Sequence, residues 1–228
     1  MKKKGKLIVI EGGDGAGKAT QAKLLIDALK QKSVSVEYLD FPRYDESLFG
    51  ALTGRALKGE FGDFRHLSPY LASLPYSLDR VAAKDAIKAA LGKGIVICNR
   101  YTSSNVAFQA TKLSGKARRD FIDFLERAEY DELGLPRPSL VIYLYVPAHI
   151  AHELVAGKER RGYLNKKKGA RDQHESDHRY QGMVVDTYLH LCRRRLDWKA
   201  IVCARKGKLL SREEIHARVM KEVSAHLR

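Results

Sequence analysis

The sequence predicts an α/β fold in which helices flank a five-stranded parallel sheet. Five short apolar runs are separated by helical segments, and each run is continuous rather than alternating, which is typical of parallel strands buried on both faces. The runs cover residues 7–10, 34–39, 95–98, 140–146 and 198–203. At 228 residues the chain is long enough for one domain with a full core, and no internal repeat or long linker divides it.

The first apolar run leads directly into a glycine-rich turn and a helix, with the spacing Gly-x4-Gly-Lys of a phosphate-binding loop. Glycines let consecutive backbone N–H groups turn inward around an anion, and the helix N-terminus adds partial positive charge. Lys18 adds a full charge for the β- and γ-phosphates. The residues expected to bind a nucleoside triphosphate are Gly12, Gly13, Asp14, Gly15, Ala16, Gly17, Lys18, Ala19 and Thr20.

Two arginines follow the next two predicted strands, Arg43 after the second and Arg100 after the third. Ligands of open parallel sheets bind beyond the carboxyl ends of the strands, so both arginines are expected to face the crevice of the phosphate-binding loop. A second anion site beside the first is what a kinase with a phosphorylated acceptor needs.

A helix is expected to begin at Pro69, with the Ser68 hydroxyl as its cap, and to kink or restart at Pro75. Tyr76 and Arg80 are four residues apart and therefore share one face of this helix. An aromatic ring beside a guanidinium group suits a heterocyclic base, although an aromatic residue at helical spacing is also typical of a core.

The composition limits the partners and the compartment. There are 42 Lys and Arg against 27 Asp and Glu, a net charge of +15, which suits nucleotides as well as nucleic acid. The basic residues are spread along the chain without an aromatic-interleaved stripe, so nucleic acid is not the expected partner. Three widely spaced cysteines and the lack of a signal peptide or an apolar run of ~20 residues indicate a cytoplasmic protein without a membrane span.

The chain resembles the thymidylate kinase family over almost its whole length. The matching segments are residues 7–21, 41–43, 74–80, 99–108, 159–175 and 196–199. The resemblance implies a P-loop nucleoside monophosphate kinase fold and transfer of the γ-phosphoryl group of ATP, with Mg²⁺, to dTMP, giving dTDP and ADP for dTTP synthesis. It also implies a homodimer, which is expected to form through the helices around residues 68–91 and 103–125.

The resemblance also implies roles for individual residues. Arg43 and Arg100 would hold the acceptor phosphate, Asp14 would contact the sugar 3′-hydroxyl, Tyr76 would stack on thymine, and Arg80 would reach its 4-carbonyl. The remaining implied substrate-binding residues are Phe41, beside Arg43, Phe108, near base and sugar, and Tyr101 and Asn105, near the 2′ position.

The family has two catalytic arrangements, with a transition-state arginine either in the phosphate-binding loop or on a lid. Here the loop position holds Gly15. The polar segment of about 157–179 is expected to be a short mobile lid on a single domain of residues 1–228. This segment carries Arg160, Arg161 and Arg171. The chain therefore resembles the lid-arginine type. The implied catalytic residues are Lys18, Arg100, Arg160, Arg161 and Arg171, the last three also being compatible with solvated charges on a loop.

This chain departs from the family at three positions around the expected magnesium site. Ala19 replaces a hydroxyl residue, Asn99 stands where an aspartate usually precedes the arginine, and Tyr145 occupies a position that is often acidic. No residue is assigned as a metal ligand, and only Asn99, acting through water, is a candidate. We expect Mg²⁺ to be held mainly by the nucleotide and by water.

Two other functions stay open from the sequence. One is a kinase for another nucleoside monophosphate, such as dUMP. The other is a non-catalytic nucleotide-binding protein, which the depleted metal site favours and the retained Lys18, Arg43 and Arg100 disfavour.

Overall fold

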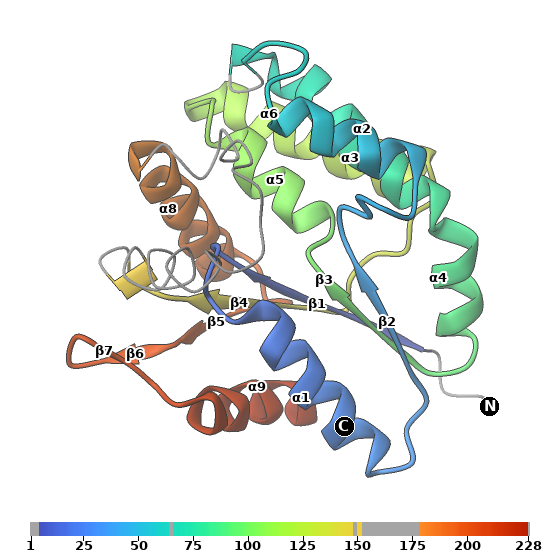
Figure 1. The fold of residues 1–228 in the computed structure, drawn as a ribbon, viewed down its shortest axis with the longest axis vertical. Helices are drawn as coiled ribbons and strands as arrows, with labels where there is room; N and C mark the ends of the chain where they lie inside the picture. Colours follow the sequence, from blue (N-terminus) through green and yellow to red (C-terminus); the bar gives the residue numbers. More distant parts are fainter. Residues whose placement is uncertain (1–4, 64–65, 148–149, 152–177, 228) are drawn as a thin grey trace, which may run out of the picture.

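The computed structural model describes residues 5–63, 66–147, 150–151 and 178–227. Its centre is a parallel five-stranded sheet in the order β2-β3-β1-β4-β5 (Figure 1). The strands are β1 (Lys6–Gly12), β2 (Val36–Asp40), β3 (Ile95–Asn99), β4 (Leu140–Tyr145) and β5 (Trp198–Val202). All five predicted strands are present, so the predicted fold class is confirmed. The second strand begins two residues later than expected, and Cys203 lies buried just beyond β5.

Helices cover both faces of the sheet, with α1 and α9 on one face and α3, α5 and α8 among those on the other (Figure 1). The helices are α1 (Lys18–Lys30), α2 (Leu48–Leu57), α3 (Pro69–Ala82), α4 (Lys84–Leu91), α5 (Thr102–Ala110), α6 (Gly115–Glu126), the π-helical turn η2 (Arg127–Glu132), α8 (His178–Arg194) and α9 (Arg212–Leu227). A short antiparallel hairpin, β6 (Ala204–Arg205) and β7 (Lys208–Leu209), follows the sheet. None of the described helices is long and apolar enough to cross a membrane.

Side chains that alternate along β1 divide the core in two. Ile8 and Ile10 pack in the cluster that includes residues of α1 and α9, whereas Leu7 and Val9 pack in the cluster that includes residues of α5, α6 and α8. Both sets are almost fully buried. A strand that is apolar on both faces therefore needs helices on both faces, which explains the continuous apolar runs of the sequence.

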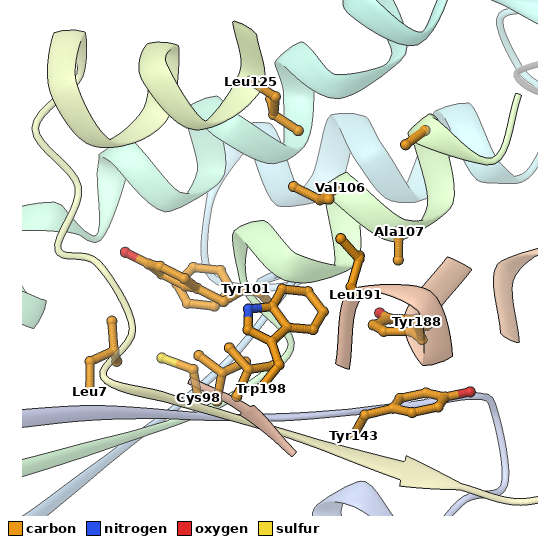
Figure 2. Close-up of a cluster of buried hydrophobic side chains, with 14 of the residues drawn as sticks. Leu7, Cys98, Tyr101, Val106, Ala107, Leu125, Tyr143, Tyr188, Leu191 and Trp198 are labelled. Atoms are coloured by element: carbon orange, nitrogen blue, oxygen red, sulfur yellow. The ribbon is translucent and has the colours of Figure 1, made fainter. Parts of the chain in front are cut away.

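Aromatic side chains fill the second cluster. Tyr143 of β4 and Tyr188 of α8 stack with their ring centroids 4.4 Å apart, and Trp198 of β5 lies beside Tyr188 (Figure 2). This stacking fixes α8 against the sheet. Because α8 begins at His178, directly after residues 152–177, the expected lid segment lies outside the described residues except for His178 and Arg179.

The structure differs from two expectations for α3. The helix does not restart at Pro75 but is continuous from Pro69 to Ala82. Proline removes only the hydrogen bond to the Leu71 carbonyl, and Leu71 is well exposed to water. The Ser68 side chain makes no capping hydrogen bond. The Ser68 backbone carbonyl accepts from the Ala72 amide at 2.9 Å. Pro69 at the first helical position is as expected.

Candidate active site

A cavity of about 490 Å³ opens beyond the carboxyl ends of β1, β2 and β3. The residues that surround it come from the phosphate-binding loop, from the segments that follow β2 and β3, from α3 and from α5. Among the predicted site residues its lining includes Asp14, Lys18, Phe41, Arg43, Tyr76, Arg80, Arg100, Tyr101, Asn105 and Phe108, with Asn99 beside them. Every residue predicted to bind the acceptor thus lies in one place. Arg160, Arg161 and Arg171 lie outside the described residues.

The phosphate-binding loop depends on two left-handed residues, Gly15 (φ 80°) and Gly17 (φ 86°), and Gly17 immediately precedes α1. A side chain at either position would strain the backbone. Lys18 Nζ donates to the Gly13 carbonyl at 3.0 Å and lies 3.7 Å from Asp14 Oδ1. Its burial, with the nearby positive charge of Arg100, lowers the pKa of Lys18 to about 8.

Arg100 reaches the loop from the end of β3. Its backbone is left-handed (φ 64°), and its amide donates to the Ile10 carbonyl at 3.0 Å, which joins this turn to β1. Its Nη2 donates to Asp14 Oδ1 at 2.9 Å. A non-glycine residue in this conformation is costly and is kept where the surrounding structure requires it. Burial opposes the charge of Arg100, but interactions with Asp14, Tyr188 and Glu11 together outweigh burial and raise the pKa of Arg100.

Arg43 is held by a buried carboxylate that the sequence analysis did not identify. Its Nε lies 3.1 Å from Asp79 Oδ1, and Ser47 Oγ donates to the same oxygen at 2.5 Å. The Ser47 hydroxyl also caps α2 by accepting from the Gly50 amide. The one available signal was the position of Asp79 directly before Arg80, which by itself indicates no pairing with Arg43.

Aromatic rings form the walls between the anion sites and the deeper end of the cavity. Phe41 and Tyr101 make an edge contact, with ring centroids 5.9 Å apart, and Arg100 lies over the Phe108 ring at 5.5 Å. The Tyr101 hydroxyl donates to the Pro136 carbonyl at 3.2 Å, so the ring is a fixed wall. Tyr76 lines the cavity from α3 and packs on Ala56, Leu57 and Ala72.

Arg80 is buried and paired with Glu129 of η2, a residue that no sequence pattern singled out. The Arg80 Nε and Nη2 atoms donate to the two carboxylate oxygens at 2.8 and 2.5 Å. Asn105 of α5 donates from Nδ2 to Ser73 and Glu129, and its Oδ1, although buried, has no hydrogen-bond partner among the described residues. Two residues that line the cavity therefore carry an oriented guanidinium and an amide oxygen without a partner among the described residues.

Glu11, near the end of β1, is a third buried carboxylate that the sequence analysis did not single out, after Asp79 and Glu129. It accepts four hydrogen bonds, from the Tyr101 amide and from the hydroxyls of Ser103, Ser104 and Tyr188. The bonds from Tyr101, Ser103 and Ser104 secure the start of α5, directly after Arg100. Glu11 thus fixes Arg100 relative to the phosphate-binding loop.

The residues near the loop fit a weakly held magnesium ion. Asn99 belongs to the cavity lining, and its buried Oδ1 has no hydrogen-bond partner among the described residues. A neutral oxygen suits Mg²⁺ that keeps water and phosphate ligands. Ala19 offers no oxygen from its side chain, and the described residues contain no group of three or more His, Cys, Asp or Glu that could hold a metal.

A phosphate-binding loop, two strand-end arginines and an aromatic-walled pocket between parallel strand ends define a nucleoside monophosphate kinase by class. The thymidylate kinase family model matches residues 10–215. The chain belongs to the thymidylate kinase family.

Named relatives agree with this membership. The chain is 36% identical over 187 residues to thymidylate kinase of Mycobacterium tuberculosis, covering 81% of this chain and 85% of that one. It is 32% identical over 224 residues to the Plasmodium falciparum enzyme, covering 98% and 91%. The solved structure of Candida albicans thymidylate kinase shares the fold, with a TM-score of 0.69 at 22% identity over 98% of this chain and 94% of that one.

Proposed function

We propose that this protein transfers the γ-phosphoryl group of ATP to dTMP and produces dTDP and ADP. An oxygen of the dTMP phosphate attacks the γ-phosphorus, and the bond from that phosphorus to the β,γ-bridging oxygen breaks, leaving ADP. The acceptor phosphate is already a nucleophile, so no general base is needed. Catalysis therefore depends on positioning and on neutralising charge.

The single observation that carries this proposal is the shared cavity of Lys18, Arg43 and Arg100. Lys18 and the loop amides bind the donor phosphates, and the two arginines hold the acceptor phosphate. Arg100 is bonded to Asp14 of the loop at 2.9 Å, which supports a direct link between the donor and acceptor sites. Asp14 is assigned to the sugar 3′-hydroxyl.

The far end of the cavity suits thymine. Arg80 Nη1 makes neither bond of the pair with Glu129 and can donate to a ring carbonyl. The Asn105 Oδ1 atom can accept from a ring N–H. Thymine and uracil offer a carbonyl beside an N–H, whereas cytosine offers an amino group beside a bare nitrogen. Tyr76 supplies the stacking surface, and Phe41, Tyr101 and Phe108 enclose base and sugar.

The lid and the metal complete the proposal. We assign residues of about 157–179 to a lid on a single 1–228 domain, with Arg160, Arg161 or Arg171 reaching the transferred phosphoryl group. Mg²⁺ bound with ATP would neutralise phosphate charge, and Asn99 is the residue that would contact it through water. Thr20 is assigned to the α-phosphate.

A homodimer is supported by an apolar surface on α3 and α6. Leu71, Leu74 and Leu78 lie on one face of α3 and are 59%, 49% and 37% exposed. Tyr70 links this face to the exposed Phe124 of α6, with ring centroids 4.9 Å apart. Exposed apolar residues that cluster on one surface are typical of an interface. The three free cysteines support a reducing compartment such as the cytoplasm.

The experiment that tests the proposal is a coupled ADP-release assay with dTMP, dUMP, dCMP and dGMP. We expect dTMP to give the highest kcat/KM, dUMP a lower value, and dCMP and dGMP little turnover. A preference for dCMP or dGMP would overturn the assignment. Nucleotide binding without turnover of any of the four would favour a non-catalytic protein.

A further inference from the structure

Glu129 does not line the cavity, yet it contacts both polar groups at the base end. It lies on η2, 49 residues beyond Arg80, and is fully buried. Its two oxygens accept five hydrogen bonds. Oε1 accepts from Ser77 Oγ at 2.7 Å, Arg80 Nη2 at 2.5 Å and Asn105 Nδ2 at 3.3 Å. Oε2 accepts from Arg80 Nε at 2.8 Å and Thr102 Oγ1 at 2.6 Å.

The bonds to Arg80 fix how its guanidinium is presented. A bidentate pair through Nε and Nη2 uses one edge of the planar group and directs the remaining nitrogen, Nη1, away from the carboxylate. Arg80 itself belongs to the cavity lining. Glu129 therefore makes this side of the pocket a hydrogen-bond donor.

The bond to Asn105 fixes the orientation of an amide. Its Nδ2 faces Glu129 Oε1, the Ser73 carbonyl and Ser77 Oγ. The first two oxygens cannot donate, and the Ser77 hydroxyl donates to Glu129 Oε1. The amide nitrogen must occupy this side, so Oδ1 takes the opposite one, where it has no partner among the described residues. Asn105 lines the cavity, so the group that Glu129 leaves for it to offer a ligand is an acceptor.

The ionised form of Glu129 is essential to this orientation, because a protonated carboxyl could itself donate. Burial disfavours the charge, but the charge of Arg80 and the hydrogen bonds from Arg80, Thr102 and Ser77 together outweigh burial, and the pKa of Glu129 is lowered. The group is thus an obligate acceptor near neutral pH.

We propose that Glu129 is a positioning residue that sets the hydrogen-bonding polarity of the base pocket, one donor from Arg80 and one acceptor from Asn105. This inference rests on the proposed function. The resulting pair complements a ring carbonyl beside an N–H. Cytosine presents the reverse polarity at both atoms and is rejected, because it leaves buried polar groups without partners.

Glu129→Gln tests the inference because glutamine keeps the size of the side chain but replaces one acceptor oxygen with a donor. With the new amide facing Asn105, the Asn105 amide turns over and presents its nitrogen to the pocket. We expect the ratio of kcat/KM for dTMP to that for dCMP to fall about 10-fold or more, mainly through KM for dTMP. The KM for ATP should stay within about 2-fold, since the hydrogen bonds of Glu129 go to residues of α3 and α5 rather than to the phosphate-binding loop.

Two further variants control for folding. Glu126→Gln changes a carboxylate three residues earlier in the chain. Glu126 pairs with Arg195, outside the cavity lining, so this variant should leave the ratio of kcat/KM for dTMP to that for dCMP unchanged. Glu129→Asp keeps the charge, but its shorter side chain cannot reach both Arg80 and Asn105, so the ratio should fall in this variant too. Thermal unfolding of all three shows which of them are folded.

The outcomes separate this inference from the proposed function. If the wild type prefers dTMP and folded Glu129→Gln or Glu129→Asp keeps the same ratio of kcat/KM for dTMP to that for dCMP, the inference is overturned while the proposed function stands. Equal losses of kcat/KM for dTMP and for dCMP in these variants would indicate a merely structural role for Glu129 and would also overturn the inference. A wild type that does not phosphorylate dTMP would overturn the proposed function, and the inference with it.

Discussion

Arg43 and Asp79, 36 residues apart in the chain, are joined by three hydrogen bonds. The Arg43 amide donates to Asp79 Oδ2 at 2.8 Å, its Nε to Oδ1 at 3.1 Å, and its Nη2 to the Asp79 carbonyl at 2.9 Å. Backbone and side chain are fixed together, so Arg43 is held in place before any ligand arrives. Preorganised charge of this kind stabilises a bound anion at little entropic cost.

Asp79→Asn should therefore weaken acceptor binding. The neutral amide cannot match the charge of Arg43, and we expect KM for dTMP to rise by about 10-fold or more, with KM for ATP within about 2-fold. Steady-state kinetics with each substrate varied would measure both values. The matched control is Asp120→Asn, because Asp120 forms an exposed pair with Lys116 and neither residue belongs to the cavity lining. Equal effects on the two KM values would contradict this role for Asp79.

Arg100→Ala should reduce kcat/KM for dTMP by about 10²–10³-fold, because it removes a charge that holds the nucleophile in line. The fold should survive, since the truncated side chain lies at the cavity and the backbone bond to Ile10 remains. The ADP-release assay measures kcat/KM, and circular dichroism shows whether the variant is folded. Arg137→Ala, which removes an exposed pair with Asp131, is the control. Activity within 3-fold of wild type would refute the assignment of Arg100.

The pKa of Lys18 predicts a pH dependence for ATP. Because this pKa is lowered to about 8, the free enzyme loses the Lys18 charge as the pH rises through 8 rather than through 10.5. We expect kcat/KM for ATP to decline above pH 8. ATP favours the charged lysine, so binding at pH 8 should take up protons, which calorimetry in buffers of different ionisation enthalpy detects. A flat profile from pH 7 to 9.5 without proton uptake would contradict the prediction.

The depleted metal site predicts weak intrinsic Mg²⁺ binding. With Ala19 and a neutral Asn99 at the loop, isothermal titration of the nucleotide-free protein should detect no site of micromolar affinity, whereas addition of ATP should produce magnesium-dependent binding. Micromolar Mg²⁺ binding by the protein alone would show that other residues hold the ion.

The apolar face of α3 predicts the oligomeric state. Leu74→Glu places a charge at the centre of the exposed leucines, and we expect it to convert a dimer into a monomer in light scattering coupled to size exclusion. Leu196→Glu, at a 92% exposed position before β5, should leave the mass unchanged. A wild-type monomer, or a dimer that survives Leu74→Glu, would place the interface elsewhere or exclude it.

The parts of the site that depend on local spacing were predictable from the sequence. The turn from β1 into α1 contains its glycines and Lys18 within seven residues, and strand ends bring Arg43 and Arg100 to the same edge of the sheet. Short continuous apolar runs between helical segments likewise located all five strands, because strands of a parallel sheet are buried on both faces.

The residues that hold the site in place were not predictable in the same way. Glu129 meets Arg80 only because η2 packs against α3 and α5, and Asp79 meets Arg43 only after α3 lies beside the end of β2. No periodic pattern marks a carboxylate whose partners are distant in sequence. The helix does not restart at Pro75 for a related reason, because the packing of α3 outweighs a local helix-breaking rule.

The central claim, that the acceptor is dTMP, is tested most directly by following one reaction with ³¹P NMR. Wild-type protein, ATP, Mg²⁺ and dTMP should give the paired α- and β-phosphate signals of dTDP in a one-to-one ratio with ADP. ADP accompanied by inorganic phosphate, with dTMP unchanged, would contradict the account, as would the absence of any turnover.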